Sequence, residues 1–215
     1  HEMTICVSNV GYKTKGGHLT SPDTQTNWNG ITGRIELIGY KNAHAENVML
    51  WCDIHSKTVR VTANITGGKS GKAVISAESF NSEKSHTPEV QSFEYTDGKL
   101  DALYKMGNDC LLWSEHEPNL YKLRIDIDGD VSEHIIGMRE FNTEGGKFTI
   151  NGEKTFLRGK HDGMIFPKTA FAPTDLDEWL RVMKISKSYG MNHYRYHTCC
   201  PPEAAFVAAD MLGIY

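Results

Sequence analysis

Two short stretches of the sequence carry side chains that are well suited to chemistry. The first, residues 158–162, reads Arg-Gly-Lys-His-Asp and directly follows the apolar run 155–157; the second, residues 195–197, reads Arg-Tyr-His. Imidazole, guanidinium and carboxylate groups can donate or accept hydrogen bonds and hold a neighbouring charge. Any one of these residues alone could equally be a structural ion-pair partner or a loop cap. We expect at least one of the polar residues at these two places to contact a ligand: Arg158, Lys160, His161, Asp162, His197 or Thr198.

Strands and helices alternate in the part of the chain that carries these residues. Residues 155–157 form a compact apolar run after the Asn151-Gly152 pair, which is a strong signal for a tight two-residue turn. The stretch Thr174-Asp175-Leu176-Asp177 predicts a capping box, with Thr174 as the N-cap of a helix. Leu176, Trp179, Leu180 and Met183 follow at helical spacing, so Trp179 is expected in a helix core rather than as a stacking platform for a ligand. Gly190 then predicts the end of this helix.

A second strand and a second helix follow. Residues 193–197 are aromatic and predict a strand, Pro201-Pro202 predicts a helix start, and Gly213 predicts its end. The order strand, helix, strand, helix indicates a parallel sheet or barrel. In parallel barrels the active-site groups lie at the C-terminal ends of the strands. With strands at 155–157 and 194–196, both polar clusters would lie on the same rim.

Residues 1 to about 140 have the sequence pattern of a β-sandwich. Short and often alternating apolar runs are separated by Gly, Asn, Ser and Lys turns. The strands that we expect cover residues 4–7, 33–38, 48–51, 58–65, 73–77 and 121–126.

Two loops in this part have alternative interpretations. The stretch 67–72, Gly-Gly-Lys-Ser-Gly-Lys, resembles a phosphate loop, but it lacks the full spacing and no helix signal follows, so a hairpin loop is favoured. The stretch 126–130, Asp-Ile-Asp-Gly-Asp, resembles a calcium loop, but no glutamate follows at the required place, so a turn between strands is favoured.

The composition narrows the class of protein. The chain has 215 residues, a net charge of -4 and a hydrophobic fraction of 39%, which predicts one or two folded domains. The absence of a Lys/Arg-rich run argues against nucleic-acid binding, and no apolar stretch is long enough to span a membrane. Five scattered cysteines, at positions 6, 52, 110, 199 and 200, form neither a disulfide framework nor a zinc-site spacing. We therefore expect no metal and no cofactor.

Five segments together resemble glycoside hydrolase family 2, the family of β-galactosidases, β-glucuronidases and β-mannosidases. Residues 1–9 and 24–38 resemble the end of its sugar-binding jelly roll, and "LLWSEHEPNLYKLRIDI" (111–127) resembles the end of its immunoglobulin-like domain. Residues 136–162 resemble the entry into its barrel with the first barrel strand, and residues 188–215 resemble the second strand and the following helix. The segments occur in the order of the family and cover almost the whole chain.

The resemblance implies three regions and an incomplete active site. Residues 1–40 would be the last strands of a jelly roll, 41–140 an immunoglobulin-like β-sandwich, and 141–215 the start of a TIM (β/α)8 barrel. Family members are retaining exo-glycosidases that cleave with two glutamates on later barrel strands. This chain shows no such pair, so by itself it is expected to be inactive and to provide only part of a sugar site.

The resemblance also implies roles for the candidate residues. Arg195 matches an arginine of the second barrel strand, and His161 and His197 lie close to histidines that follow the first and second strands. The spacing differs: the chain has Arg-x-His where many members have Arg-x-x-His, and the loop at Gly159–Asp162 is shorter than the common pattern. His161, Asp162, Arg195 and His197 are thus expected to bind substrate.

The parent protein is expected to hydrolyse terminal β-linked sugars, with a β-galactosidase-like activity as the first hypothesis. The competing hypothesis is a non-catalytic module that binds a carbohydrate or acts as a spacer. The expected partners are a carbohydrate and the remainder of the same polypeptide, with neither nucleic acid nor membrane. A periplasmic or secreted bacterial location fits this substrate class; the specific sugar and the formation of a homo-oligomer are left open.

Overall fold

The computed structural model describes residues 2–8, 31, 33–197 and 199–215. Its contacts divide the chain into two compact units. One is Ile38–Leu157, and the other combines Arg158–Tyr215 with the N-terminal segment. Each unit is described by itself below.

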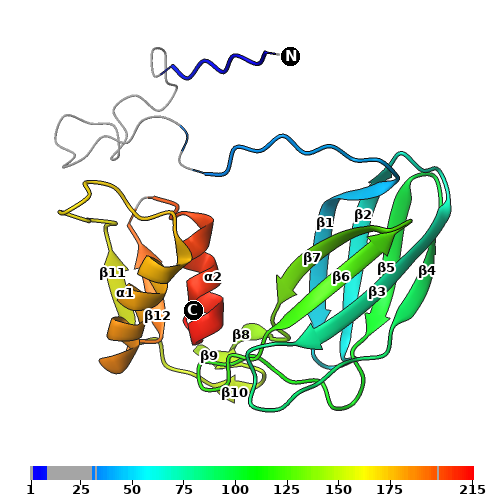
Figure 1. The fold of residues 1–215 in the computed structure, drawn as a ribbon. Helices are drawn as coiled ribbons and strands as arrows, with labels where there is room; N and C mark the ends of the chain where they lie inside the picture. Colours follow the sequence, from blue (N-terminus) through cyan, green and yellow to red (C-terminus); the bar gives the residue numbers. More distant parts are fainter. Residues whose placement is uncertain (1, 9–30, 32, 198) are drawn as a thin grey trace. The chain divides into compact units, whose positions relative to one another are not determined.

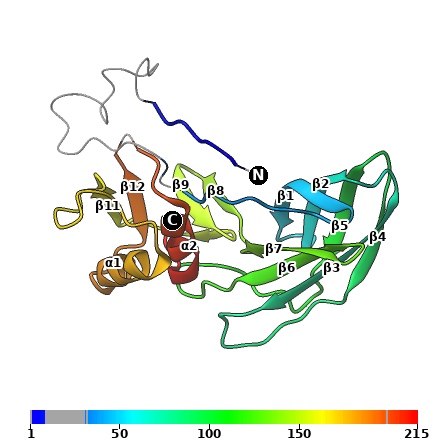
Figure 2. The ribbon, with the colours of Figure 1, turned by 45° about the horizontal axis from the view of Figure 1, so that its top comes forward.

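The unit Ile38–Leu157 is built mainly from two antiparallel sheets (Figures 1 and 2). The three-stranded sheet has the order β1 (His44–Asp53), β2 (Thr58–Thr66), β5 (Lys99–Lys105). The four-stranded sheet has the order β4 (Gln91–Tyr95), β3 (Gly71–Ser79), β6 (Tyr121–Ile127), β7 (Asp130–Ile136).

One hydrophobic core lies between these two sheets. Strands β2, β5 and β6 alternate strictly between buried and more exposed residues over most of their length, so each sheet turns one face inward. The inward residues Val61, Tyr104, Ile75 and Leu123 are fully buried and belong to the same cluster. The β-sandwich predicted from the alternating pattern is therefore present in this unit.

A small third sheet follows β7 in the same unit. It has the order β10 (Glu153–Lys154), β9 (Lys147–Ile150), β8 (Phe141–Glu144). Asn151 and Gly152 connect β9 to β10 with φ values of 52° and 82°, which confirms the predicted two-residue turn. The side chain of Asn151 accepts a hydrogen bond from Glu140 N (2.9 Å) and donates one to Trp113 O (3.0 Å), so the turn is tied to the sandwich.

The α/β unit contains two parallel strands and two helices. The elements follow in the order β11 (Gly159–Asp162), α1 (Leu176–Ser188), β12 (His193–Tyr196), α2 (Glu203–Leu212). Its core is formed around Trp179 and Met183 of α1, Tyr194 of β12, and Ala205 and Ala208 of α2. The predicted order of strands and helices is confirmed. The described residues form no closed barrel, which would need eight strands.

The helix ends fit the sequence signals with one correction. Gly190 and Gly213 follow the helices with φ values of 80° and 69°, as predicted. The N-cap of α1, however, is Asp175 and not Thr174, because the carboxylate of Asp175 accepts the hydrogen bond from Glu178 N at 2.9 Å. Trp179 is fully buried, which confirms its place in the helix core.

Three predicted strands are wrong. Residues 155–157 form no strand: Thr155 N donates to Phe148 O (2.9 Å), so this run continues the β9–β10 hairpin, and the strand that pairs with β12 begins at Gly159. Residues 4–7 and 33–38 also form no strand. A strand needs a neighbour for its backbone groups, and the described residues provide none for these two segments. The rest of the predicted jelly-roll segment, residues 9–30 and 32, lies outside the described residues.

The structure decides between the alternative interpretations of the loops 126–130 and 67–72. Residues 126–130 make the turn between β6 and β7, with Gly129 N bound to the carboxylate of Asp126 (2.8 Å), which confirms the turn. The loop 67–72 is not a hairpin loop, because β2 and β3, which it joins, belong to different sheets. It crosses from one layer of the sandwich to the other.

Candidate functional site

The parallel pairing of β11 with β12 decides which candidate residues share a face. In the register His161 lies opposite Arg195, and Asp162 lies opposite Tyr196. Successive side chains of a strand point to opposite faces. His161 and Arg195 therefore share one face, whereas Asp162 shares the other with Tyr194 and Tyr196.

The face with His161 and Arg195 is open. Both side chains are exposed, while Tyr194 on the opposite face packs against the helices. An Nη1 atom of Arg195 lies 3.3 Å from His161 Nε2, and the rings of His161 and His197 are 4.8 Å apart between centroids. Since a guanidinium can only donate, His161 Nε2 is the acceptor if this contact is a hydrogen bond. Three of the four candidate residues are thus brought together.

The fourth candidate, Asp162, is separated from them. Its side chain is buried on the helix-covered face, where it accepts a hydrogen bond from Met164 N (2.7 Å) and pairs with Lys160 Nζ (2.9 Å). Burial, and secondly the charge of Asp162, raise the pKa of Tyr196. These contacts hold the C-terminal end of β11 on its helix-covered face. They also keep the carboxylate of Asp162 away from the His161–Arg195 pair.

Arg158 also departs from the position expected for it. The residue precedes β11, so it lies at the opposite end of the strand from Asp162. Its Nε donates to Gly190 O at 2.6 Å. Arg158 therefore holds the turn after α1 and does not join the cluster of His161, Arg195 and His197.

Two neighbouring residues, His193 and Asn192, belong to the same architecture but were not among the candidates taken from the sequence. His193 shares the open face with Arg195, and its ring lies so close to Gly159 that a Cβ there would be 2.6 Å from His193 Nδ1. Asn192, just before β12, is buried and accepts a hydrogen bond from Arg158 N (2.7 Å). A polar residue directly before an aromatic strand was the available signal for Asn192.

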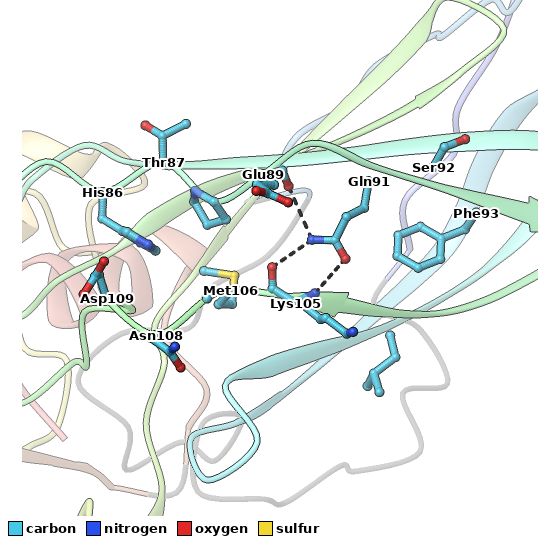
Figure 3. Close-up of a pocket in the computed structure, with 13 residues that line it drawn as sticks. His86, Thr87, Glu89, Gln91, Ser92, Phe93, Lys105, Met106, Asn108 and Asp109 are labelled. Carbon is cyan, nitrogen blue, oxygen red and sulfur yellow. Dashed lines mark hydrogen bonds between the residues drawn. The ribbon is translucent and has the colours of Figure 1, made fainter.

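A separate hollow of about 740 Å³ lies in the sandwich, between β4 and β5 (Figure 3). The amide of Gln91 crosses it, donating to Lys105 O (2.8 Å) and accepting from Lys105 N (3.1 Å). His86 Nδ1 is bound to the hydroxyl of Tyr121 (2.7 Å), and burial lowers the pKa of His86. These two bonds give the backbone N and O of Lys105 the partners that a neighbouring strand would provide at the edge of β5. Gln91 therefore has a structural role. The open face of β11 and β12 is the better candidate site.

Neither a metal centre nor a membrane segment is found in the described part of the chain. No three His, Cys, Asp or Glu side chains there are grouped so that they could hold a metal ion. Of the helices described, none is long and apolar enough to cross a membrane.

Comparison with known proteins identifies the family of the sandwich. Residues 43–139 match the model of the glycosyl hydrolases family 2. A β-galactosidase of Leuconostoc mesenteroides is 22% identical over 94% of this chain and 21% of its own length. A putative β-glucuronidase of Formosa agariphila is 31% identical over 48% of the chain and 13% of its own length.

Solved structures agree on the fold. The Parabacteroides merdae β-glucuronidase matches with a TM-score of 0.63 and 19% identity, covering 80% of this chain and 23% of that one. A family 2 member from Bacteroides cellulosilyticus DSM 14838 matches with a TM-score of 0.64 and 21% identity, covering 80% and 26% respectively. The chain thus spans about a fifth of the Leuconostoc enzyme and a smaller share of the Formosa protein. The match of residues 43–139 to the family model confirms the resemblance to glycoside hydrolase family 2 that is seen in the sequence.

Proposed function

We propose that this chain is part of a retaining exo-β-glycosidase, and that its α/β unit supplies one wall of the sugar site. The observation that carries the proposal is the grouping of His161, Arg195 and His197 on one open face of two parallel strands. All three lie on or just beyond the C-terminal half of their strands, where parallel barrels place ligand-binding groups. Imidazole and guanidinium groups in this arrangement suit sugar hydroxyls or a catalytic carboxylate.

The proposal includes the finer fold. The strand order β1-β2-β5 facing β4-β3-β6-β7 supports an immunoglobulin-like sandwich. The backbone of Tyr215 donates to Asn192 O (2.8 Å) and accepts from Tyr194 N (3.0 Å), the pair of bonds made by a residue on a neighbouring parallel strand. These two bonds support a third strand beside β12 at Tyr215, as the start of a (β/α)8 barrel would have. The order jelly roll, sandwich, barrel start over 1–40, 41–140 and 141–215 remains part of this proposal.

The α/β unit contributes binding rather than bond cleavage. Retaining hydrolysis needs two carboxyl groups roughly 5–5.5 Å apart. On β11, β12 and the described residues that directly follow them, the one carboxylate is Asp162, which faces the helices. The acid/base and the nucleophile would therefore come from other residues of the parent protein. The names of the relatives favour β-galactosides and β-glucuronides as substrates.

Hydrolysis of aryl β-galactoside, β-glucuronide and β-mannoside tests the proposal. The 215-residue chain is assayed alone and, where the reading frame continues, within the longer polypeptide. We expect cleavage with retained configuration only by the longer form. Arg195→Ala should lower its kcat/KM on the order of 10²-fold, because a fixed donor at the reacting sugar is lost. Arg181→Ala is the matched control, since Arg181 pairs with Glu178 on the exposed surface of α1 and should change kcat/KM less than about twofold.

Three outcomes would count against the proposal. Cleavage by the 215-residue chain alone would mean that its own carboxylates suffice. An unchanged kcat/KM in Arg195→Ala would remove the open face from the site. No cleavage of any glycoside by the longer form would favour the non-catalytic carbohydrate-binding or spacer module.

A further inference from the structure

Asn192 is a buried polar residue whose bonds join separate parts of the α/β unit. Only 1% of it is exposed, and it lies directly before β12. Its side-chain oxygen accepts from Arg158 N at 2.7 Å, and its own backbone N donates to Arg158 O at 3.1 Å. One residue thus binds both backbone groups of Arg158, the residue directly before β11.

The backbone oxygen of Asn192 binds a third segment of the chain, at Tyr215. It accepts from Tyr215 N (2.8 Å), while Tyr215 O accepts from Tyr194 N (3.0 Å). Asn192 therefore binds the chain where β11 begins, where β12 begins and at Tyr215. Its position lies at the end of the strands opposite to Asp162 and His197, so it does not contact the candidate site.

This arrangement determines which side chains meet at the site. The pairing that begins at Arg158 and Asn192 runs on to place His161 opposite Arg195. A slip of one residue would turn His161 to the helix-covered face and bring Lys160 or Asp162 to the open one. Backbone bonds alone repeat along a strand, whereas the bond from Arg158 N to the side chain of Asn192 exists in one register only.

We propose that Asn192 is a positioning residue: it sets the register of β11 against β12 and so places His161 beside Arg195. The chemistry requires an acceptor of this length at this position. Leucine has nearly the same shape but no acceptor, so a buried N–H of Arg158 would be left unpaired. Aspartate keeps both the shape and the acceptor. The relevance of the register to sugar binding rests on the proposed function; the register itself does not.

The first experiment uses the unchanged 215-residue chain labelled with 15N and 13C. A long-range HNCO spectrum detects coupling through a hydrogen bond between an amide nitrogen and the acceptor carbonyl carbon. We expect a cross-peak between Arg158 N and the side-chain carbonyl carbon of Asn192. Its absence, in a spectrum that shows the backbone bonds of β11 and β12, would overturn the proposal whatever the variants do.

The second experiment compares Asn192→Leu with Asn192→Asp. In Asn192→Leu we expect amide exchange of Arg158 to rise roughly ten- to a hundredfold, as for a buried hydrogen bond that is lost. We also expect cross-strand contacts between His161 and Arg195 to disappear from NOE spectra, and the 15N shift of His161 Nε2 to move. Asn192→Asp should keep the contacts and the shift.

A matched control separates register from general stability. Ser186 is also buried and bonds the hydroxyl of Tyr194 at 2.5 Å from the helix-covered side. Ser186→Ala removes a buried bond to the same strand without touching Arg158, so the His161–Arg195 contact should persist. Loss of this contact in Ser186→Ala or in Asn192→Asp would overturn the proposal, and so would its survival in a folded Asn192→Leu. If Asn192→Leu does not fold, Asn192→Asp and the HNCO spectrum decide.

The inference and the proposed function can fail separately. Suppose that Asn192→Leu loses the His161–Arg195 contact in the 215-residue chain but retains full kcat/KM in the longer polypeptide. The role of Asn192 in the register is then supported, and the proposed position of the sugar site is wrong. If kcat/KM falls in Arg195→Ala while Asn192→Leu keeps the contact, the sugar site stands and the role of Asn192 is wrong.

Discussion

The sandwich and the α/β unit use the same kind of side chain in different ways. In the sandwich, the guanidinium of Arg139 lies 4.6 Å above the ring of the buried Trp113. In the α/β unit, the guanidinium of Arg195 lies on an exposed sheet face beside His161. Both arginine side chains are exposed, so they differ in the neighbour that the guanidinium meets: an apolar ring for Arg139 and a polar imidazole for Arg195.

The solvent-facing sides of the sheets differ as well. Both sheets of the sandwich turn one face to a shared core, and their outer faces carry ion pairs such as Arg60–Asp101 and Arg124–Glu133. The two-stranded sheet has helices on one face, and its other face carries exposed polar groups. The comparison predicts that core changes affect stability in the sandwich, whereas open-face changes affect binding in the α/β unit.

The largest expected effect is the loss of Trp113. Its side chain is 1% exposed, so Trp113→Ala should lower the free energy of unfolding of the sandwich by about 3–5 kcal/mol. Urea unfolding followed by NMR amide signals of β2 and β6 measures this change. Trp51→Ala is the matched control, because Trp51 is 45% exposed on the same unit and should cost far less. Equal losses in both variants would contradict the structural role assigned to Trp113.

A smaller effect concerns the cysteines of the two units. Burial raises the pKa of Cys52 in the sandwich from 9.0 to about 11, whereas Cys200 in the α/β unit is exposed. The thiolate is the reactive form, so at pH 8 iodoacetamide should label Cys52 roughly 100-fold more slowly in the folded chain than in the urea-unfolded chain, and also more slowly than the exposed Cys200. Mass spectrometry of peptides over time measures both rates. Similar rates would show that Cys52 is accessible and ionises normally.

The same pKa shift predicts how stability depends on pH. The folded state favours the protonated thiol of Cys52, so its contribution is fully present below pH 9 and is lost as pH rises toward about 11. The free energy of unfolding should fall over this range by at most about 1.4 kcal/mol per pH unit from this residue. Cys52→Ala should remove this part of the slope. An unchanged slope in the variant would assign the pH dependence to other groups.

The sequence predicted local features of both units well. The turn at Asn151-Gly152, the buried face of α1 around Trp179, and the glycines after each helix depend on neighbouring residues only, and all are confirmed. What failed depends on distant partners. Residues 155–157 have the composition of a strand, but the strand that pairs with β12 is Gly159–Asp162, fixed by bonds from residues more than 30 positions away.

The candidate site shows the same division. The residue types and the end of the second strand could be read from the sequence, but the end of the first strand and the side chains that meet could not. Asp162 adjoins His161 in the chain and yet faces the helices, because the alternation of the strand and its register separate them. The position of the loop 67–72 between two sheets likewise depends on strand pairing that no local signal specifies.

The smallest expected effect distinguishes two adjacent residues at the start of α1. Asp175→Ala should lower the free energy of unfolding of the α/β unit by about 1 kcal/mol, because the carboxylate that accepts from Glu178 N is removed. Thr174→Ala should change it by less than about 0.3 kcal/mol, since Thr174 is exposed and lies outside the cap. Urea unfolding followed by the amide signals of α1 measures both variants.

The result would also sharpen the contrast between the two units. A cap replaced at the start of α1 should leave the amide signals of the sandwich core unchanged, because Asp175 bonds only within its own helix turn in the contacts described for it. If Thr174→Ala is the more damaging change, the helix begins one residue earlier, as the capping-box pattern predicts, and the N-cap assigned to Asp175 is wrong. If Asp175→Ala is the more damaging, a single carboxylate stabilises the first turn of the helix that covers the rear face of β11 and β12.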